Sequence, residues 1–422
     1  MNTLSNRDAQ VVWHPYSQPG RDKMVLPVLS AQGAYLHLED GSKVLDAISS
    51  WWVNIHGHSH PKIAAAIAEQ AAKLEHVIFS GFTHEPAVRL AEILLEATQS
   101  RGAPYRKVFY SDNGSTAVEV ALKMAYQYFQ NRKVQGRERF IALRGSYHGD
   151  TLGAMAVGDP EGFHSRFKRL LPAVDFIEPG DIVALESLLQ KNPGQYAAFI
   201  FEPLIQGAEG MKTYSPVFLK SAMALCRDNE VLTIGDEVFT GFYRTGTRFA
   251  FEQLGMAPDL LCISKGITGG FLPLSATLAT GQVFEAFVSS EMRDAFLHGH
   301  SYTANPIACA AALASWEILN SEECQKTIRT ICETTKECVS QFEGHPKVKS
   351  VRTVGTIGAV EVHQKDTYYS VAKEKIIAAA VREGVLLRPL GNVLYSVPPY
   401  CVTRQEVQKI YKTLGDLIHE YF

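Results

Sequence analysis

The chain lacks the features that mark secreted and membrane-spanning proteins. Its seven cysteines form no Cys-x-x-Cys pair, and an odd number of scattered cysteines argues for free thiols rather than a disulfide framework. Residues 1–20 contain no apolar segment of the kind found in signal peptides. No uninterrupted apolar run approaches the roughly 18 residues that a membrane span needs. We therefore expect a cytoplasmic protein without a membrane partner.

An excess of charge of either sign is also missing. The formal net charge is −3 over 422 residues, which gives no reason to expect nucleic acid or an anionic membrane as a partner. The phosphate-binding patterns GxxxxGK[ST] and GxGxxG do not stand at the ends of the apolar runs. A hydrophobic content of 46% and a charged content of 20% are ordinary for a globular protein. The length is sufficient for two domains.

Short apolar runs alternate with helical stretches between about residues 105 and 280. Five such runs cover residues 107–110, 140–143, 198–201, 231–234 and 260–263. Buried strands that alternate with helices predict an α/β fold with a mostly parallel central sheet. Each run is followed by glycine, polar or charged residues. We expect these residues to meet at the carboxyl edge of the sheet, where such folds bind ligands.

The segments on either side of this region have a different pattern. Residues 28–38 read as a strand pair around Gln32 and Gly33, and residues after about 320 alternate between helices and short strands with glycines. We expect a large domain over residues 55–320. A smaller α+β domain should combine residues 1–54 and 321–422.

Lys265 directly follows Ser264 at the end of the apolar run 260–263. Burial of an unpaired ammonium is costly, so a lysine here makes sense if its amine is neutral and nucleophilic, or covalently used. The hypothesis is that Lys265 forms a Schiff base with a cofactor aldehyde.

Asp236 lies at the end of the run 231–234. Its carboxylate could keep a pyridine nitrogen protonated, which makes the ring an electron sink. A helix N-cap or a structural ion pair is the alternative. The presence of Lys265 at the end of a later run favours the cofactor interpretation, in which Val238 and Tyr147 lie against opposite faces of the ring.

Gly114 and Ser115 follow one apolar run and open a predicted helix. A glycine and a hydroxyl at a helix N-terminus can form a phosphate cradle, although a plain helix-capping turn is the alternative. A second loop of this kind, Gly299-His300-Ser301, precedes a helix that starts at Pro306. It could add phosphate contacts, or it could simply cap its helix.

Two further features have alternative interpretations. His56, His58 and His60 alternate in a way that can bind a metal, but Gly57 and Ser59 favour a loop and no carboxylate or cysteine cluster accompanies them. We therefore assign no metal, and the same applies to His298 and His300. Arg388, in an apolar context, is suited to bind a substrate carboxylate with two parallel hydrogen bonds, or to form an internal ion pair.

Taken together, these residues resemble the class III, pyridoxal-phosphate-dependent aminotransferases of fold type I. The most specific segments are residues 235–246, 257–259 and 264–266. The resemblance implies that Lys265 holds pyridoxal 5′-phosphate in a Schiff base, that Asp236 binds the pyridine nitrogen, and that Gly114 and Ser115 bind the phosphate. It also implies a homodimer with shared active sites, in which Gly299, His300 and Ser301 reach the neighbouring subunit.

Within the family, residues 13–16, 50–52, 55–57, 147–151, 206–211 and 388–391 are similar to the biotin-biosynthetic branch. That resemblance implies transfer of an amino group to 8-amino-7-oxononanoate, with S-adenosyl-L-methionine as donor or, in some members, lysine. The family loop often reads Gly-Pro-Thr or Gly-Ser-Thr where Gly299-His300-Ser301 stands, and Ser301 keeps the hydroxyl. The residues implied to shape the substrate pocket are Tyr16, Trp51, Trp52, Tyr147, Arg244, Lys265, Gly299, Arg388 and Tyr395.

Three alternatives remain open at this point. One is another class III ω-amino acid aminotransferase or a related decarboxylating enzyme. Phe239 weakens the aminobutyrate and ornithine versions, which usually carry glutamine at this position. The second is a metal-dependent hydrolase built on the histidines. The third is a binding protein that has lost catalysis, which Lys265 and Asp236 argue against.

Overall fold

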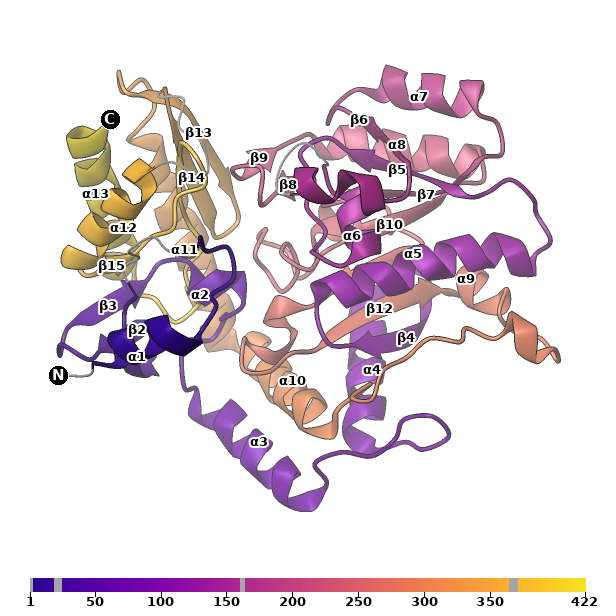
Figure 1. The fold of residues 1–422 in the computed structure, drawn as a ribbon, viewed down its shortest axis with the longest axis horizontal. Helices are drawn as coiled ribbons and strands as arrows, with labels where there is room; N and C mark the ends of the chain where they lie inside the picture. Colours follow the sequence, from indigo (N-terminus) through magenta and orange to yellow (C-terminus); the bar gives the residue numbers. More distant parts are fainter. Residues whose placement is uncertain (1–2, 19–24, 160–163, 364–370) are drawn as a thin grey trace.

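The computed structural model describes residues 3–18, 25–159, 164–363 and 371–422, which form two lobes (Figure 1). The larger lobe, on the right of this view, contains the central sheet. The smaller lobe, on the left, contains both ends of the chain. Helices α3 (Pro61–Lys73) and α10 (Pro306–Leu319) pack against each other below the two lobes.

The central sheet has seven strands in the order β4-β12-β11-β10-β7-β5-β6. Only β12 runs antiparallel to its neighbours, so the prediction of an α/β fold with a mostly parallel sheet is confirmed. The strands are β4 (Tyr105–Ser111), β12 (Ser275–Thr280), β11 (Leu260–Ile263), β10 (Leu232–Asp236), β7 (Tyr196–Phe201), β5 (Arg139–Leu143) and β6 (Val174–Ile177).

Two of these strands were not predicted. The sequence of β12, Ser-Ala-Thr-Leu-Ala-Thr, contains only one large apolar residue, although all six of its residues are buried. The apolar pattern of the edge strand β6 is interrupted by Asp175, which binds Arg139 of the neighbouring strand β5 and Tyr196 of the next strand, β7. In both strands tertiary packing overrides a weak local pattern.

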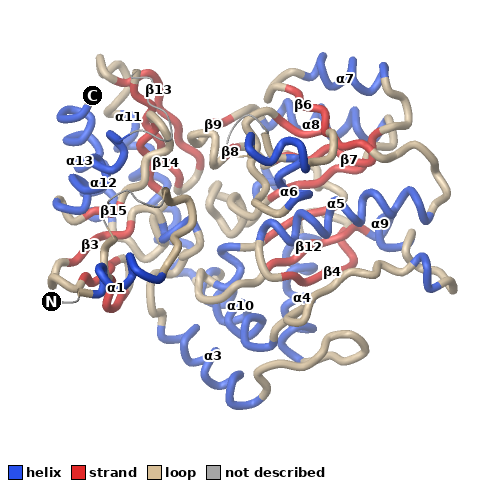
Figure 2. The backbone as a smooth tube through the Cα atoms, in the orientation of Figure 1, coloured by secondary structure: helices blue, strands red, loops and turns tan. Residues whose placement is uncertain are grey.

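Helices cover both faces of this sheet, as Figure 2 shows. Within β11, Leu260 and Cys262 pack in the cluster that contains α5, and Leu261 and Ile263 pack in the cluster on the other face. This alternation is the period of a strand that is buried on both sides. The helices are α4 (Glu85–Gln99), α5 (Gly114–Asn131), α6 (Leu152–Val157), α7 (Ile182–Lys191), α8 (Pro216–Asp228) and α9 (Gly281–Glu285).

The smaller lobe joins segments from both ends of the chain. Strand β3 pairs parallel with β15, so residues near 45 and 385 share one sheet. This pairing supports the division into residues 55–320 and residues 1–54 with 321–422, which we propose as the domain organisation. The strands are β1 (Val28–Gln32), β2 (Tyr35–Leu38), β3 (Lys43–Asp46) and β15 (Val385–Leu386) in one sheet, and β13 (Val348–Val354), β14 (Ile357–Val362) and β16 (Val393–Ser396) in the other.

The remaining elements are helices of the smaller lobe and short connecting segments. Helix α1 (Leu4–Val11) was not predicted from the sequence. The other helices are α2 (Ser49–Trp52), α11 (Glu322–Ser340), α12 (Val371–Arg382) and α13 (Arg404–Tyr421). A two-stranded ribbon, β8 (Ile205–Gln206) and β9 (Lys212–Thr213), and the 3₁₀ turns η1 (Ser165–Leu170), η2 (Ala250–Gln253), η3 (Lys265–Thr268) and η4 (Met292–Asp294) complete the set. Within the described ranges, every helix is too short or too polar to cross a membrane.

Candidate active site

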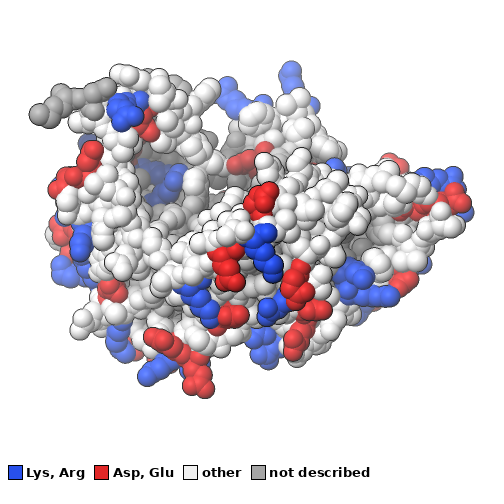
Figure 3. Space-filling model, turned by 90° about the horizontal axis from the view of Figure 1, so that it is seen from below, with Lys and Arg blue, Asp and Glu red and all other residues white. Residues whose placement is uncertain are grey.

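A cavity of about 440 Å³ lies at the carboxyl edge of the central sheet. The loops after β4, β5, β7, β10 and β11 all line it, as we expected from the five apolar runs. Figure 3, which views the molecule from below, shows a hollow toward the smaller lobe with Lys or Arg atoms inside it. The lining residues used below are Trp52, Asn113, Gly114, Ser115, Tyr147, His148, Gly149, Glu202, Asp236, Val238, Phe239 and Lys265.

Lys265 begins η3 directly after β11 and has a positive φ of 47°. Its Nζ lies 4.7 Å from the centre of the Trp52 ring and 5.4 Å from that of Phe239. Desolvation by these surroundings lowers the pKa of the Lys265 amine to about 8, although the carboxylates of Asp236 and Glu202 oppose the shift. At a pKa of about 8, roughly a tenth of the amine is neutral at pH 7, far more than for an exposed lysine.

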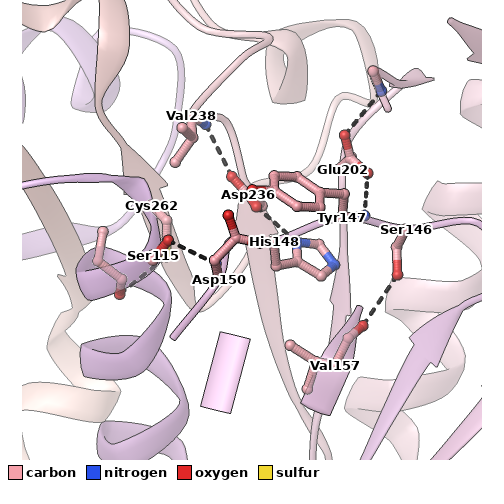
Figure 4. Close-up of polar contacts among 12 residues, drawn as sticks. Ser115, Ser146, Tyr147, His148, Asp150, Val157, Glu202, Asp236, Val238 and Cys262 are labelled. Carbon is pink, nitrogen blue, oxygen red and sulfur yellow. Dashed lines mark hydrogen bonds and ion pairs between the residues drawn. The ribbon is translucent and has the colours of Figure 1, made fainter. Parts of the chain in front are cut away.

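Asp236 ends β10 and is buried. Its Oδ2 accepts a hydrogen bond of 2.6 Å from His148 Nδ1, and its Oδ1 accepts one of 3.0 Å from the Val238 backbone N–H (Figure 4). His148 Nε2 is buried without a partner among the described residues. Sequence reasoning assigned no role to His148. Its position next to Tyr147 in the loop after β5 was the only sequence feature that could have marked it as a site residue.

Glu202 is a second buried carboxylate that sequence reasoning left without a role. It directly follows β7, and a carboxylate at the end of that apolar run was the sequence feature that could have marked it as a site residue. Its two oxygens accept hydrogen bonds of 3.1 Å and 3.0 Å from the backbone N–H groups of Tyr147 and Gly207 (Figure 4). Desolvation raises the pKa of Glu202 to about 7, while His148 acts in the opposite direction. Glu202 thus fixes the backbone of Tyr147 in the cavity wall.

The N-terminus of α5 forms a cradle for an anion. Asn113 caps the helix by accepting from the Thr116 N–H, and the N–H groups of Gly114 and Ser115 have no hydrogen bond to any described residue. A Cβ on Gly114 would lie 2.6 Å from Val238 Cγ1, and one on Gly149 would clash with the Ser115 side chain. The absence of these two Cβ atoms keeps the cradle open. Such a helix N-terminus is suited to a phosphate.

The outer wall of the site is a stack of side chains from distant segments. The Tyr16 hydroxyl donates to Asp150 Oδ2 at 2.6 Å and lies 3.2 Å from the Tyr147 hydroxyl. The Tyr16 and Trp51 rings meet edge to face at 5.4 Å. The guanidinium of Arg388 lies 4.0 Å from the centre of the Trp51 ring. An aromatic and cationic surface beside the cavity is thus formed by Tyr16, Tyr147, Trp51 and Arg388.

The inner wall contains Trp52 and two aromatic neighbours. Trp52 Nε1 donates to the Tyr395 hydroxyl at 3.1 Å, and its ring packs against Phe239 at 4.5 Å. Because Lys265 lies over the same two rings, this wall provides the apolar surroundings of the lysine amine.

Arg244 lies outside the set of lining residues. It is fully buried, donates to the backbone carbonyls of Pro398 and Asn54 at 2.7 Å and 3.3 Å, and stacks on Tyr400. Desolvation lowers its pKa. Arg244 therefore supports the segments behind the site.

Gly299, His300 and Ser301 do not line this cavity either. His300 Nδ1 lies 3.5 Å from Asp112 Oδ2, at the entrance to the α5 cradle. The role of this loop in a neighbouring subunit stays a prediction.

The alternating histidines have separate environments. His56 Nε2 lies 3.0 Å from the Ser315 hydroxyl, and desolvation lowers the pKa of His56 to about 3. His58 binds Asp46. Within the part of the chain that the structure describes, no group of three or more metal-ligating side chains gathers.

Comparison with known proteins identifies the family. The model of the class III aminotransferase family matches residues 16–418. The chain belongs to the class III aminotransferases. Enzymes of this family use pyridoxal 5′-phosphate, and the cradle, the buried carboxylate and the lysine of this cavity fit that cofactor. Family membership also decides against the hydrolase alternative.

Three relatives illustrate the range of similarity. An adenosylmethionine-8-amino-7-oxononanoate aminotransferase from Synechococcus elongatus is 47% identical and aligns over 97% of this chain and 98% of its own length. A structure of the enzyme of that name from Methanocaldococcus jannaschii is 36% identical, with a TM-score of 0.92 and 99% of each chain covered. An amine transaminase from an uncultivated Pseudomonas species is 30% identical, with a TM-score of 0.91 and 98% and 99% covered.

Proposed function

We propose that the protein transfers an amino group from S-adenosyl-L-methionine to 8-amino-7-oxononanoate, giving 7,8-diaminononanoate for biotin biosynthesis. The names of relatives at 47% and 36% identity support this substrate pair. Backbone similarity does not distinguish it, because amine transaminases superpose with nearly the same TM-score. The side chains of the wall must therefore carry the assignment.

The stack of Tyr16, Trp51 and Arg388 is the observation that carries the proposal. Each proposed substrate has a carboxylate, which the Arg388 guanidinium is suited to bind. The aromatic faces of Tyr16 and Trp51 can pack the aliphatic chain of one substrate and attract the sulfonium of the other. One wall can thus serve two unlike molecules.

The residues of the cavity would hold pyridoxal 5′-phosphate at three points. Gly114 and Ser115 would bind its phosphate, Asp236 would pair with its ring nitrogen, and the Lys265 amine would bind its aldehyde carbon. When bound, the cofactor supplies an electron sink for the carbon that loses a proton. His148 orients the Asp236 carboxylate by donating to Oδ2. Val238 and Tyr147, which both line the cavity, would lie against the two faces of the ring.

Lys265 is the residue that moves the proton. Its amine must be neutral to accept a proton from the amino donor, and its lowered pKa of about 8 supports this state near neutral pH. After accepting the proton at Nζ, Lys265 returns it on the path to product. Trp52 and Phe239 exclude water from the amine during this transfer.

A homodimer with shared active sites is part of the proposal. Two exposed large apolar side chains flank the Gly299-His300-Ser301 segment, Leu297 at 73% and Tyr302 at 61%. Exposed apolar residues of this size favour a protein interface. We also propose that the enzyme works in the cytoplasm, where its seven free cysteines stay reduced.

The dimer can be tested by mixing two inactive variants. One carries Lys265→Ala, and the other carries both His300→Ala and Ser301→Ala. Shared sites predict that mixed dimers regain up to about a quarter to a half of the activity, since one site per mixed dimer is then intact. Light scattering on the wild type should give twice the monomer mass. A monomer mass with full activity would contradict the proposal.

A half-reaction assay tests the substrate pair. The purified holoenzyme would receive S-adenosyl-L-methionine, lysine or an ω-amine such as aminobutyrate in separate samples, and the absorbance of the bound cofactor would be followed. 8-Amino-7-oxononanoate would then be added, and mass spectrometry would detect the product 7,8-diaminononanoate. Response to S-adenosyl-L-methionine supports the proposal. Response to lysine alone changes the donor only. Response to the ω-amine alone favours an amine transaminase, the second candidate.

A further inference from the structure

The backbone that presents the two wall tryptophans is strained. Ser49, Ser50 and Trp52 all have positive φ angles, of 52°, 59° and 65°. None of these residues is glycine, and such conformations persist only where the surroundings hold them. The wall of the proposed substrate site therefore depends on whatever fixes this turn.

The buried carboxylate of Asp46 is one group that fixes it. Asp46 ends β3 and is fully buried. Its Oδ1 accepts from the Ile48 N–H at 3.1 Å, and its Oδ2 accepts from the Ser50 N–H at 2.6 Å. The backbone on both sides of Ser49, where the strained segment begins, is thus tied to one side chain. A carboxylate is well suited to this task because it can accept several hydrogen bonds at once.

His58 in turn binds this carboxylate. Its Nε2 lies 2.9 Å from Asp46 Oδ2 and must donate, since a carboxylate can only accept. The Asn54 side-chain amide lies 3.1 Å from the other ring nitrogen. The backbone of His58 is itself fixed by two hydrogen bonds with Gly33, of 2.6 Å and 3.1 Å. His58 therefore approaches Asp46 from a position that is held against the β1–β2 turn.

The turn places its two tryptophans on different parts of the site. Trp51 contacts Arg388 and Tyr16 in the outer wall. Trp52 lies under Lys265 in the inner wall. A Cβ on Gly270, five residues after the lysine, would lie 2.8–2.9 Å from backbone atoms of Asn54 and Val53. The turn and the segment that follows the lysine are therefore packed together.

We propose that Asp46 and His58 form a positioning pair that holds Trp51 and Trp52 in the geometry needed for substrate binding. The pair touches no reacting group and acts only through the turn. This inference rests on the proposed function in assigning a substrate wall to these tryptophans. It gives His58 a role that a metal-binding interpretation of the alternating histidines would not predict.

The sharpest test compares two variants of His58. Glutamine carries an N–H donor at about the reach of histidine Nε2, whereas asparagine places its amide near the position of Nδ1. His58→Asn should raise KM for both substrates about tenfold or more, with kcat within about threefold, because a small displacement of the wall weakens binding. His58→Gln should restore KM to within about threefold of the wild type.

A second readout does not need substrate. In a Trp13→Phe, Trp316→Phe background, fluorescence reports only Trp51 and Trp52, because the chain has four tryptophans. His58→Asn should increase acrylamide quenching in the holoenzyme, and His58→Gln should not. The KM comparison would use whichever pair of substrates the wild type accepts. Failure of the proposed substrate assignment therefore does not decide the test of the Asp46–His58 pair.

Three outcomes would overturn the proposal. A lowered Tm of His58→Asn with unchanged KM and quenching would show that the pair contributes only to stability. An equal rise in KM and quenching for His58→Gln and His58→Asn would show that the hydrogen bond donated to Asp46 does not hold the tryptophans in place. Loss of kcat without a change in KM would place the pair in the chemical step.

Discussion

The floor and the wall of the active site are built in different ways. The floor consists of Asp236, Glu202 and Lys265, which follow consecutive neighbouring strands of one parallel sheet. The wall consists of Tyr16, the strained turn at Trp51 and Trp52, Arg388 and Tyr395, which come from separate segments of the smaller lobe. Regular structure thus positions the groups that act on the cofactor. Irregular structure positions the groups proposed to select the substrate.

This difference teaches where variation within the fold can occur. Strand ends are fixed by the hydrogen bonds of the whole sheet, so the floor cannot move without loss of the fold. The wall is held by a few side-chain contacts, such as the one between Trp52 and Tyr395. Structures named as an amine transaminase and an omega transaminase share the backbone at TM-scores of 0.91 and 0.93.

The largest effect should come from the floor. Lys265→Ala should lower kcat by at least about 10³-fold, because it removes the group that carries the proton. Steady-state kinetics would measure the loss, and circular dichroism should show an unchanged fold. Lys412→Ala, on an exposed face of α13, is the control and should keep full activity. Retention of substantial activity by Lys265→Ala would remove the distinction between floor and wall.

Arg388 tests the wall. Arg388→Ala should lower kcat/KM by about 10- to 100-fold through KM, since a hydrogen bond to a charged group contributes about 1.5–3 kcal/mol. Arg388→Lys should recover only part of this loss, because an ammonium provides neither the planar fork nor the stacking on Trp51. A decrease in kcat alone would assign Arg388 to the chemical step instead.

The α5 cradle gives a third test, on the floor. Gly114→Ala should weaken cofactor affinity about tenfold, because the new Cβ would meet Val238 and shift the cradle. Fluorescence titration of the apoenzyme with pyridoxal 5′-phosphate measures this change. Gly281→Ala is the matched control: Gly281 also begins a helix after a strand, but its Cβ would lie 3.7 Å from Arg106 Cδ, an ordinary contact. Equal effects of both substitutions would argue against the cradle.

The smallest effect concerns pH. With a pKa of about 8, the neutral fraction of Lys265 should rise about fivefold between pH 7 and pH 8 and level off above pH 9. The rate at which apoenzyme takes up pyridoxal 5′-phosphate should follow this curve, as stopped-flow absorbance can measure. Trp52→Leu removes one ring near the amine and should shift the curve. A rate that rises up to pH 10 would indicate an unperturbed lysine.

The lowered pKa of Lys265 also affects the stability of the apoenzyme. The pKa of Lys265 is lower in the folded than in the unfolded chain, so between about pH 8 and 10.5 the unfolded chain binds more protons. The Lys265 contribution to apoenzyme stability should therefore increase with pH across this window. Lys265→Met should remove that dependence in denaturant titrations.

The sequence predicted the residues of the floor more completely than the geometry of the wall. Asp236 and Lys265 each follow an apolar run, so alternation and charge alone indicated their common edge. Glu202 has the same indication, but its role depends on backbone N–H groups that no pattern reveals. The strained turn before Trp52 has no periodic signature at all. Its geometry depends on the contacts of His58 with Asp46 and Gly33, which join separate segments of the chain.

The parallel pairing of β3 with β15 has a consequence for biosynthesis. Residues near Leu45 find their partners about 340 positions later, near Val385. A chain that emerges from the ribosome has all strands of the central sheet once residue 280 has been made. Its first strands of the smaller lobe must wait, unpaired on one edge, for the C-terminal segment. A chain that ends before Val385 therefore contains every strand beneath the floor but lacks Arg388 and Tyr395 of the wall.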